Sequence, residues 1–350
     1  MKIFIPRIPW HEGFNLALRK AFAANSVDVV TNSNRYKLNR LIGALPLRKI
    51  SPVQDWERKH CLRKYNEELF RQVQLARPDV FLVFNESLLY PETILRIKAE
   101  CRCRMVCCVG DDPWDSIRWV ADFPHSLKHF EYIFSGEPAW DINIRKVSPQ
   151  AKLHWHYGGY DPDVFFPVED SAITDSDKQK LSCQVSFTGS SYGTRAEGAF
   201  RSDILSYLSD YELKIWGGDK WPYRFRFLPG LKRCYQGERL SYEELRKLYR
   251  LSKINLNLPA PQVVSTFQPR VFEIAACKGF QIIDKRDKLF DLFSEDCLVT
   301  FETIGELREK IDYYLSHESE RLNMAEKQHA IVWQRYTWSN WAGEILKVLD

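Results

Sequence analysis

The sequence has no long apolar run and no large excess of charge of one sign. None of its 350 residues lie in a stretch of about 18 apolar residues, so no membrane-spanning helix is expected. The start, MKIFIPRIPWHEGF, is interrupted by prolines, His11 and Glu12, unlike a signal peptide. The net charge of +4 gives no reason to expect nucleic acid as a partner. We therefore expect a cytoplasmic protein, either free or peripheral at the inner face of the membrane.

Cysteines with metal-binding spacing are also lacking. The nine cysteines are an odd number, and their only dense group, CRCRMVCC at 101–108, alternates as a strand does. His154 and His156 could point to one face of a strand, but no third ligand lies near them in the sequence. We expect buried reduced thiols and no metal site.

The first half of the chain alternates apolar strands with helical stretches. This order, with nearly continuous apolar strands, predicts a parallel doubly wound sheet in an α/β fold. The expected strands are at 1–6, 27–32, 79–84, 104–110, 132–136 and 152–159.

A second alternating series follows a polar stretch at 165–180 that lacks periodicity and is typical of a connector. Its strands are expected at 183–189, 213–218, 254–259, 280–284 and 298–301. We therefore predict Rossmann-like domains at 1–168 and 181–330 that face each other across a cleft. Residues 331–350 are expected to form a helix that packs back on the first domain.

Ligands of such sheets bind beyond the carboxyl ends of the strands, so the loops there are the segments of interest. In STFQPRVFEIAACKGFQII, 265–283, a helix starting near Pro269 would present its first amides beside Ser265 and Thr266, where an anion could bind. Glu273 would lie one turn inside, able to accept hydrogen bonds from a ribose diol. Equally, Glu273 could be a helix-capping charge and Arg270 a surface residue.

Two further loops could contact a nucleotide. In FTGSSYGTR, 187–195, a strand ends at Gly189, and Ser190 and Arg195 could bind phosphate oxygens, although a plain turn is the simpler interpretation. The segment CYQGERLSYEEL, 234–245, contains Gly237, whose backbone could lie against a base, followed by a capped helix start.

Taken in this order, the segments resemble the C-terminal domain of GT-B glycosyltransferases, in the form found in the group 1 (GT4-like) enzymes. The resemblance is greatest to the branch of spore-maturation (CgeB-type) glycosyltransferase-like proteins, whose pattern is roughly F-x-G followed by S-x-x-x-x-R-x-F-E-x-x-A-x-G-x-x-x-I. VSFTGSSYGTR and STFQPRVFEIAACKGFQII match it, and the resemblance covers about 183–345. VGDDPWD, 109–115, is similar to a D-D-P segment of that branch.

The resemblance implies roles for individual residues. It implies that Glu273 binds the donor ribose, that Arg195 or Arg201 and the amides near Ser265 and Thr266 bind the diphosphate, and that Arg270 supports this loop. In the larger retaining families, a Glu eight positions before the ribose Glu contacts the donor sugar. Ser265 stands at that position here, so donor sugar and stereochemistry are both open.

The first domain is expected to bind the acceptor. Its strand-end loops offer aromatic rings for sugar faces and acids for hydroxyls, at Trp10, Glu12, Asp111 and Trp114. If the enzyme inverts, Asp112 or His11 would be the catalytic base. Alternatively, His11 and Glu12 lie in a solvated loop, and Asp111 and Asp112 form an Asx turn before Pro113.

We therefore expect a glycosyltransferase that uses a nucleotide diphosphate-sugar and neither a cofactor nor a metal. The acceptor would be a glycan, a lipid-linked group or a protein. The basic aromatic segment 221–233 could contact lipid headgroups or cover the cleft. A nucleotide-sugar epimerase of similar fold and a non-catalytic two-domain binding protein are the alternatives.

Overall fold

The computed structural model describes the chain except for residues 8–11, 34–50, 85–87, 116–122, 192–195, 219 and 238, and the side chains of 51–55, 57, 58 and 196–198. The chain folds as two compact units. The first unit is Met1–His156 with Ala342–Asp350, and the second is Tyr157–Trp341.

The first unit contains a parallel six-stranded sheet in the order β2-β1-β3-β4-β5-β6. The apolar strands expected from the sequence form it because both of its faces are covered, which suits near-continuous apolar runs. All five residues of β3 are buried. The strands are β1 (Lys2–Phe4), β2 (Asp28–Val30), β3 (Val80–Phe84), β4 (Arg104–Val109), β5 (Tyr132–Ser135) and β6 (Lys152–Trp155).

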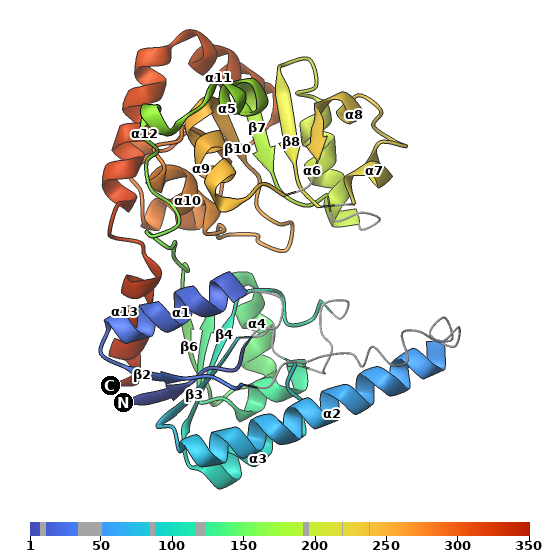
Figure 1. Cartoon of the computed structure of the whole chain (residues 1–350), viewed down its shortest axis with the longest axis vertical. Coiled ribbons are helices and arrows are strands. Elements are labelled where there is room, and N and C mark those ends of the chain that lie inside the picture. The colour runs from blue at the N-terminus through green and yellow to red at the C-terminus, as the bar shows by residue number, and fades with distance from the viewer. Residues whose placement is uncertain are drawn as a thin grey trace. The chain divides into compact units, whose positions relative to one another are not determined.

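Helices lie on the faces of this sheet (Figure 1). The long α2 (Ser51–Ala76) and α3 (Pro91–Cys101) lie side by side. Two further α-helices that lie wholly within the described part of this unit are α1 (Glu12–Ala24) and α4 (Pro138–Val147). The buried core includes residues of β3, β4 and these helices, such as Phe81, Met105 and Leu69.

The second unit contains another parallel six-stranded sheet, in the order β12-β11-β10-β7-β8-β9. The strands are β7 (Cys183–Thr188), β8 (Leu213–Trp216), β9 (Tyr235–Gly237), β10 (Ser252–Asn257), β11 (Gln281–Asp284) and β12 (Thr300–Phe301). The strand order reverses between β7 and β10, since β8 and β9 follow β7 on one side and β10 returns to its other side. This is the switch point of the second sheet.

The described α-helices of the second unit lie before, between and after these strands in the sequence. They are α5 (Asp175–Leu181), α6 (Ala196–Ser206), α7 (Trp221–Arg224), α8 (Leu231–Cys234), α9 (Tyr242–Leu251), α10 (Arg270–Ala276), α11 (Ile304–Ser316) and α12 (Glu318–Val332). Helix α10 packs beside α12, where the Ala275 carbonyl lies 3.1 Å from Nδ1 of His329.

The last helix, α13 (Trp338–Leu349), contributes to both units. It begins in the second unit, where Trp338 N–H donates to the Tyr160 carbonyl at 3.0 Å. From Ala342 onward it belongs to the first unit, in which Arg104 donates to the Leu349 carbonyl. Ala342, Ile345 and Leu349 are each at most 1% exposed.

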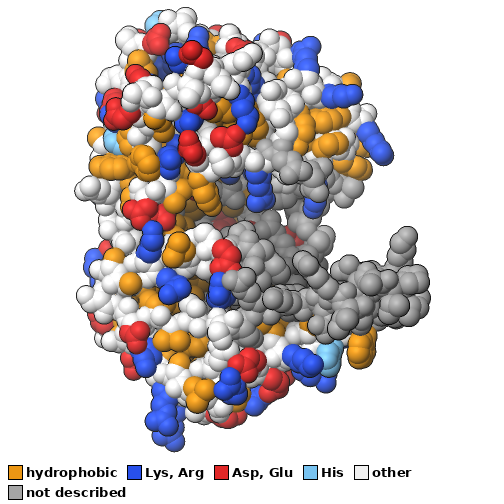
Figure 2. Space-filling view, in the orientation of Figure 1, with side chains coloured by type: hydrophobic (Ala, Val, Ile, Leu, Met, Phe, Trp, Pro, Cys, Tyr) orange, Lys and Arg blue, Asp and Glu red, His pale blue; other side chains and the backbone are white. Residues whose placement is uncertain are grey.

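The structure confirms the predicted α/β class with two parallel sheets and a C-terminal helix that returns to the first unit. It adds β9, at residues that the sequence indicates as a loop. The stretch 165–180, expected to be a connector, lies in the second unit and contains most of α5. Charged side chains of both signs are interspersed over the visible face of each unit (Figure 2).

None of the helices in the described part of the chain is both long enough and apolar enough to cross a membrane.

Candidate functional site

The switch point of the second sheet is where the candidate donor site lies. At a reversal of strand order, the connections after the two central strands leave in opposite directions and open a crevice between them. Here those strands are β7 and β10, which pair through residues such as Ile254 and Val185. The crevice is flanked by the loop that begins at Gly189 and the loop that begins at Leu258.

Three glycines end or follow β7, β8 and β9 at one edge of the sheet. Gly189 N–H donates to the Trp216 carbonyl at 2.9 Å, and Gly217 N–H donates to the Gly237 carbonyl at 3.1 Å. Side chains would not fit between these backbones, because a Cβ on Gly217 would lie 2.0 Å from the Gly189 oxygen. Gly237 has φ +125°, which L side chains rarely adopt. These glycines form a backbone edge without side chains, at which the ends of β7 and β8 are in close contact.

Arg201, on α6, lies at the crevice but is only 3% exposed. Its Nη1 donates to the Ser190 carbonyl at 2.9 Å and its Nη2 to the Leu258 carbonyl at 2.7 Å. The guanidinium also lies over the Phe187 ring, 5.3 Å from its centroid. In this arrangement, Arg201 contacts the protein backbone of both flanking loops. Arg195, the other predicted diphosphate ligand, lies outside the described residues.

The loop after β10 leads into α10 much as the sequence predicts. Pro269 is the N-cap of the seven-residue helix, without a side-chain cap. The amides of Phe272 and Glu273 already donate to the Pro269 carbonyl, so a ligand would have to use amides nearer Ser265 and Thr266. Thr266 is 2% exposed, and the Ser265 carbonyl accepts a hydrogen bond from Lys288 N–H at 3.0 Å.

The small residues of α10 and the turn after it let this helix pack closely on the sheet. Ala275 and Ala276 are fully buried. A Cβ on Gly279 would lie 2.8 Å from the Tyr249 carbonyl oxygen and 2.9 Å from Ile274, so a larger residue would move α10 away. The small size of these three residues in the sequence predicts this close packing, and the structure confirms it.

Glu273 is half-buried on α10. Burial raises the pKa of its carboxyl, and the neighbouring Arg270 guanidinium opposes part of that rise. The pKa of Tyr249, which is 1% exposed, is raised by burial and by the Glu273 charge. Among the described residues, the buried Tyr249 hydroxyl has no hydrogen-bond partner. The Glu273 carboxyl, the Arg270 guanidinium and the Tyr249 hydroxyl are therefore near enough to one another for their charges to interact.

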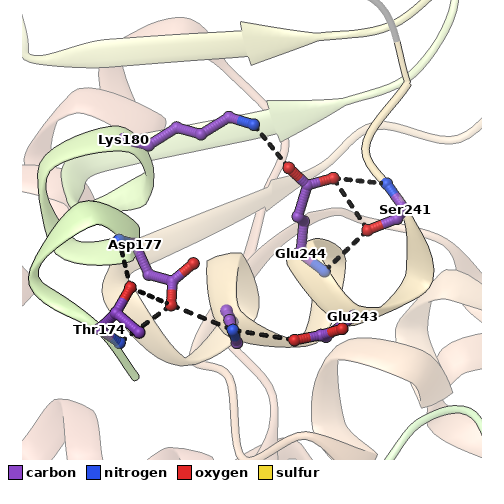
Figure 3. A network of polar contacts seen from close by, with 7 residues as sticks. Thr174, Asp177, Lys180, Ser241, Glu243 and Glu244 are labelled. Carbon is purple, nitrogen blue, oxygen red and sulfur yellow. Dashed lines mark hydrogen bonds and ion pairs between the residues drawn. The ribbon is translucent and has the colours of Figure 1, made fainter. Parts of the chain in front are cut away.

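Tyr249 is held in place by the helix that carries it. Two capping boxes are joined there by ion pairs (Figure 3). Ser241 Oγ accepts from Glu244 N–H at 3.2 Å, and Thr174 Oγ1 accepts from Asp177 N–H at 3.1 Å. Lys180 then pairs with Glu244 at 2.5 Å. The Lys180 contact and the Ser241 cap lower the pKa of Glu244 to about 2, and the network joins α5 to α9.

In the first unit, the candidate acceptor residues that the structure describes belong to two segments of the sequence. The Asp112 carboxylate accepts from Trp114 N–H at 2.9 Å, which is the Asx turn that the sequence offers as the alternative. Trp114 is 36% exposed, and Asp111 is half-buried beside this turn. Glu12 pairs with Arg7 at 2.5 Å at the start of α1. Trp10 and His11 lie outside the described residues.

The possible metal ligands of the first unit have other roles. The His154 ring stacks on Phe134 with centroids 5.4 Å apart. Burial lowers the pKa of His156 to about 4, so this ring is neutral at physiological pH. Burial raises the pKa of Cys107 and Cys108, and all nine cysteines are free. Among the described residues, no three His, Cys, Asp or Glu side chains could hold an ion together.

Two features of the site do not follow from the sequence: Gly217 as a close-packed glycine and Tyr249 as a neighbour of Glu273. The sequence indicates a loop at WGGDKW, 216–221. However, a side chain at Gly217 would collide with Gly189, which is far away in the sequence, so the need for glycine cannot be recognised locally. Tyr249 could have been found from the apolar face of α9, because a Tyr on the buried face brings a hydroxyl to the sheet.

Comparisons with known proteins agree with this architecture. Residues 199–347 match the family described as "Glycosyl transferase-like", a match that covers less than half of the chain. No curated protein matches the sequence.

Solved structures match over the whole chain at low identity. Sucrose-phosphate synthase from Thermosynechococcus elongatus has 13% identity and a TM-score of 0.67, with 100% of this chain and 98% of that chain covered. Anabaena Alr3699/HepE in complex with UDP-glucose has 14% identity and a TM-score of 0.64, with 100% and 99% covered. A UDP-forming trehalose-phosphate synthase from Burkholderia xenovorans has 9% identity and a TM-score of 0.66, with 99% and 98% covered. The chain thus has the GT-B fold of these glycosyltransferases.

Proposed function

We propose that this protein is a glycosyltransferase that moves a sugar from a nucleotide diphosphate-sugar to a glycan, lipid-linked or protein acceptor without a metal. The observation that carries the proposal is the match of residues 199–347 to a glycosyl transferase-like family, because Arg201, Gly237 and the whole of α10 lie within it. We also propose that it belongs to the CgeB-type branch and acts in the cytoplasm, free or at the inner face of the membrane.

The donor is proposed to bind at the switch point of the second sheet. Glu273 would accept hydrogen bonds from the ribose diol, since its carboxyl is half-buried and has Arg270 as a charged neighbour. The diphosphate would lie by Ser190, Arg195 and the amides near Ser265 and Thr266, with Arg270 beside it. The base would lie on the backbone edge at Gly189, Gly217 and Gly237.

The transfer itself breaks the bond between the anomeric carbon and a diphosphate oxygen, and the electron pair leaves with the nucleoside diphosphate. The acceptor oxygen bonds to the anomeric carbon and loses its proton to a base. The charge that develops on the leaving group would be stabilised by guanidinium groups and backbone amides that are already in place. In an inverting reaction, the base would be Asp112 or His11, with Trp10, Glu12, Asp111 and Trp114 binding the acceptor.

Thermal shift against UDP, GDP, dTDP, ADP and CMP, with and without Mg²⁺, tests the donor site. A ligand at about 100 times its Kd stabilises the folded state by about 2.7 kcal/mol. For a unit of this size, that amounts to roughly 5–10 °C in Tm. We expect one nucleoside diphosphate to give this shift without Mg²⁺.

The selected donor is then assayed for transfer, with Glu273→Gln as the site variant and Glu243→Gln as its control. Glu243 is a 68% exposed carboxylate of α9 in the same unit. Loss of the shift in Glu273→Gln alone would support the donor site. No shift with any nucleotide would contradict the proposed function, and release of an isomeric nucleotide-sugar without an acceptor would indicate an epimerase instead.

A further inference from the structure

The guanidinium of Arg201 is buried between two loops of its own chain. It is 3% exposed, and two of its nitrogens donate to the carbonyls of Ser190 and Leu258. Ser190 belongs to the loop after β7 and Leu258 to the loop after β10. These are the two strands between which the strand order reverses. A single side chain therefore joins the two loops that flank the crevice.

The chemistry of the contact requires an arginine. Burying a cation is unfavourable unless it is hydrogen-bonded, and here backbone carbonyls supply acceptors at 2.7 and 2.9 Å. A guanidinium donates from separate nitrogens held in one plane, so it can reach two fixed carbonyls at once. It also lies over the Phe187 ring, 5.3 Å from the ring centroid. A lysine would carry the same charge on a single nitrogen at the end of a flexible chain.

We infer that Arg201 is a positioning residue that fixes both loops of the donor site before any ligand arrives, and that it does not bind the diphosphate. The inference rests on the proposed function for the identity of the ligand. The effect of Arg201 on the loops is a property of the protein alone. The diphosphate charge is then left to other groups of the site, such as Arg270.

Hydrogen exchange of the ligand-free protein is the direct test. The Gly189 amide is protected by the Trp216 carbonyl and the Val263 amide by the Ala260 carbonyl, so each reports on one of the loops. In Arg201→Met and Arg201→Lys, we expect both amides to exchange at least tenfold faster than in the wild type. The exchange rates of the β11 amides should not change to a comparable extent. Arg233→Met is the matched control, since Arg233 donates to the Ser209 carbonyl at 2.6 Å on the surface.

Binding measurements separate positioning from direct contact. If Arg201 positions the loops, both variants should weaken the binding of the nucleoside and of its diphosphate by a similar factor, about tenfold or more. Direct binding of the diphosphate would instead leave nucleoside affinity and loop exchange as in the wild type, with Arg201→Lys retaining most of the diphosphate affinity. That result would overturn the inference.

Two further outcomes are also decisive. If Arg201→Met does not fold, Arg201→Lys keeps the charge and most of the volume, and its exchange rates decide the matter. If the wild-type protein binds no nucleotide, the proposed function fails, whereas faster exchange of the Gly189 and Val263 amides would still support the positioning role. Unchanged exchange in the lysine variant would refute it.

Discussion

Gly217→Ala should disturb the backbone edge of the donor site, whereas Gly218→Ala should not. A Cβ on Gly217 would lie 2.0 Å from the Gly189 oxygen and 2.6 Å from Nε1 of Trp221. These two atoms are themselves hydrogen-bonded at 2.9 Å. A Cβ on the adjacent Gly218 would meet nothing within 4 Å. The two variants therefore add the same methyl group to neighbouring positions with opposite surroundings.

The size of the effect follows from these contacts. The methyl group cannot be accommodated by rotating a side chain, because the nearest atom is a backbone oxygen, so β7 and β8 must separate at their ends. Overpacking of this kind costs about 1–3 kcal/mol. Losing the hydrogen bond between Trp221 and Gly189 adds about 1 kcal/mol. A total of about 2–4 kcal/mol corresponds to a fall in Tm of roughly 4–16 °C for a unit of this size.

Thermal unfolding followed by tryptophan fluorescence measures this difference. Trp221 is fully buried against the altered backbone, so its emission should also change in Gly217→Ala before unfolding. Nucleotide affinity should fall in the same variant, since the edge to which the base is proposed to bind is displaced. Equal Tm values for the two alanine variants, within about 1 °C, would refute the reasoning.

Three other substitutions test separate parts of the structure. Glu273→Gln should weaken nucleotide binding by about 1–3 kcal/mol, measured by calorimetry. The same substitution should also raise Tm at neutral pH. The pKa of Glu273 is higher in the folded than in the unfolded protein, so its ionisation lowers the stability of the wild type as pH rises above the unfolded-state pKa. Below that pKa, the difference in Tm between the variant and the wild type should vanish. Asp112→Ala should leave nucleotide affinity intact but lower the transfer rate, and a normal rate would exclude its proposed role as the base. Ser241→Ala should lower the free energy of unfolding by about 1 kcal/mol in denaturant titration, because the α9 cap is lost, and an unchanged midpoint would contradict this.

The apolar strands and the start of α10 were predictable because their patterns are local. Runs such as that of β3 are buried on both faces, and Pro269 restricts the backbone where the helix begins. Strand β9 was missed because none of its three residues is buried and no apolar run marks them. Helix α5 has one buried residue, Leu181, so it also lacks an apolar period.

The site was predictable only as far as neighbours in the sequence determine it. The placement of Glu273 on a helix and of Gly279 in the turn after it was predictable, because both lie in one segment of the sequence. The contacts of Arg201 depend on Leu258, which is 57 residues away, and no local pattern indicates that a backbone carbonyl will meet it. Asp112 was predictable as a turn residue, because Asp before Pro commonly caps a turn through its own side chain.

Helix α13 has a consequence for the order in which the chain folds during synthesis. Ala342, Ile345 and Leu349 bury their side chains in a unit whose other residues end at His156. As the chain leaves the ribosome, the second unit can be complete in sequence while the first still lacks its last helix turns. The unit that is made first is thus finished last, and a fragment ending at His156 would expose apolar surface that residues 342–350 cover.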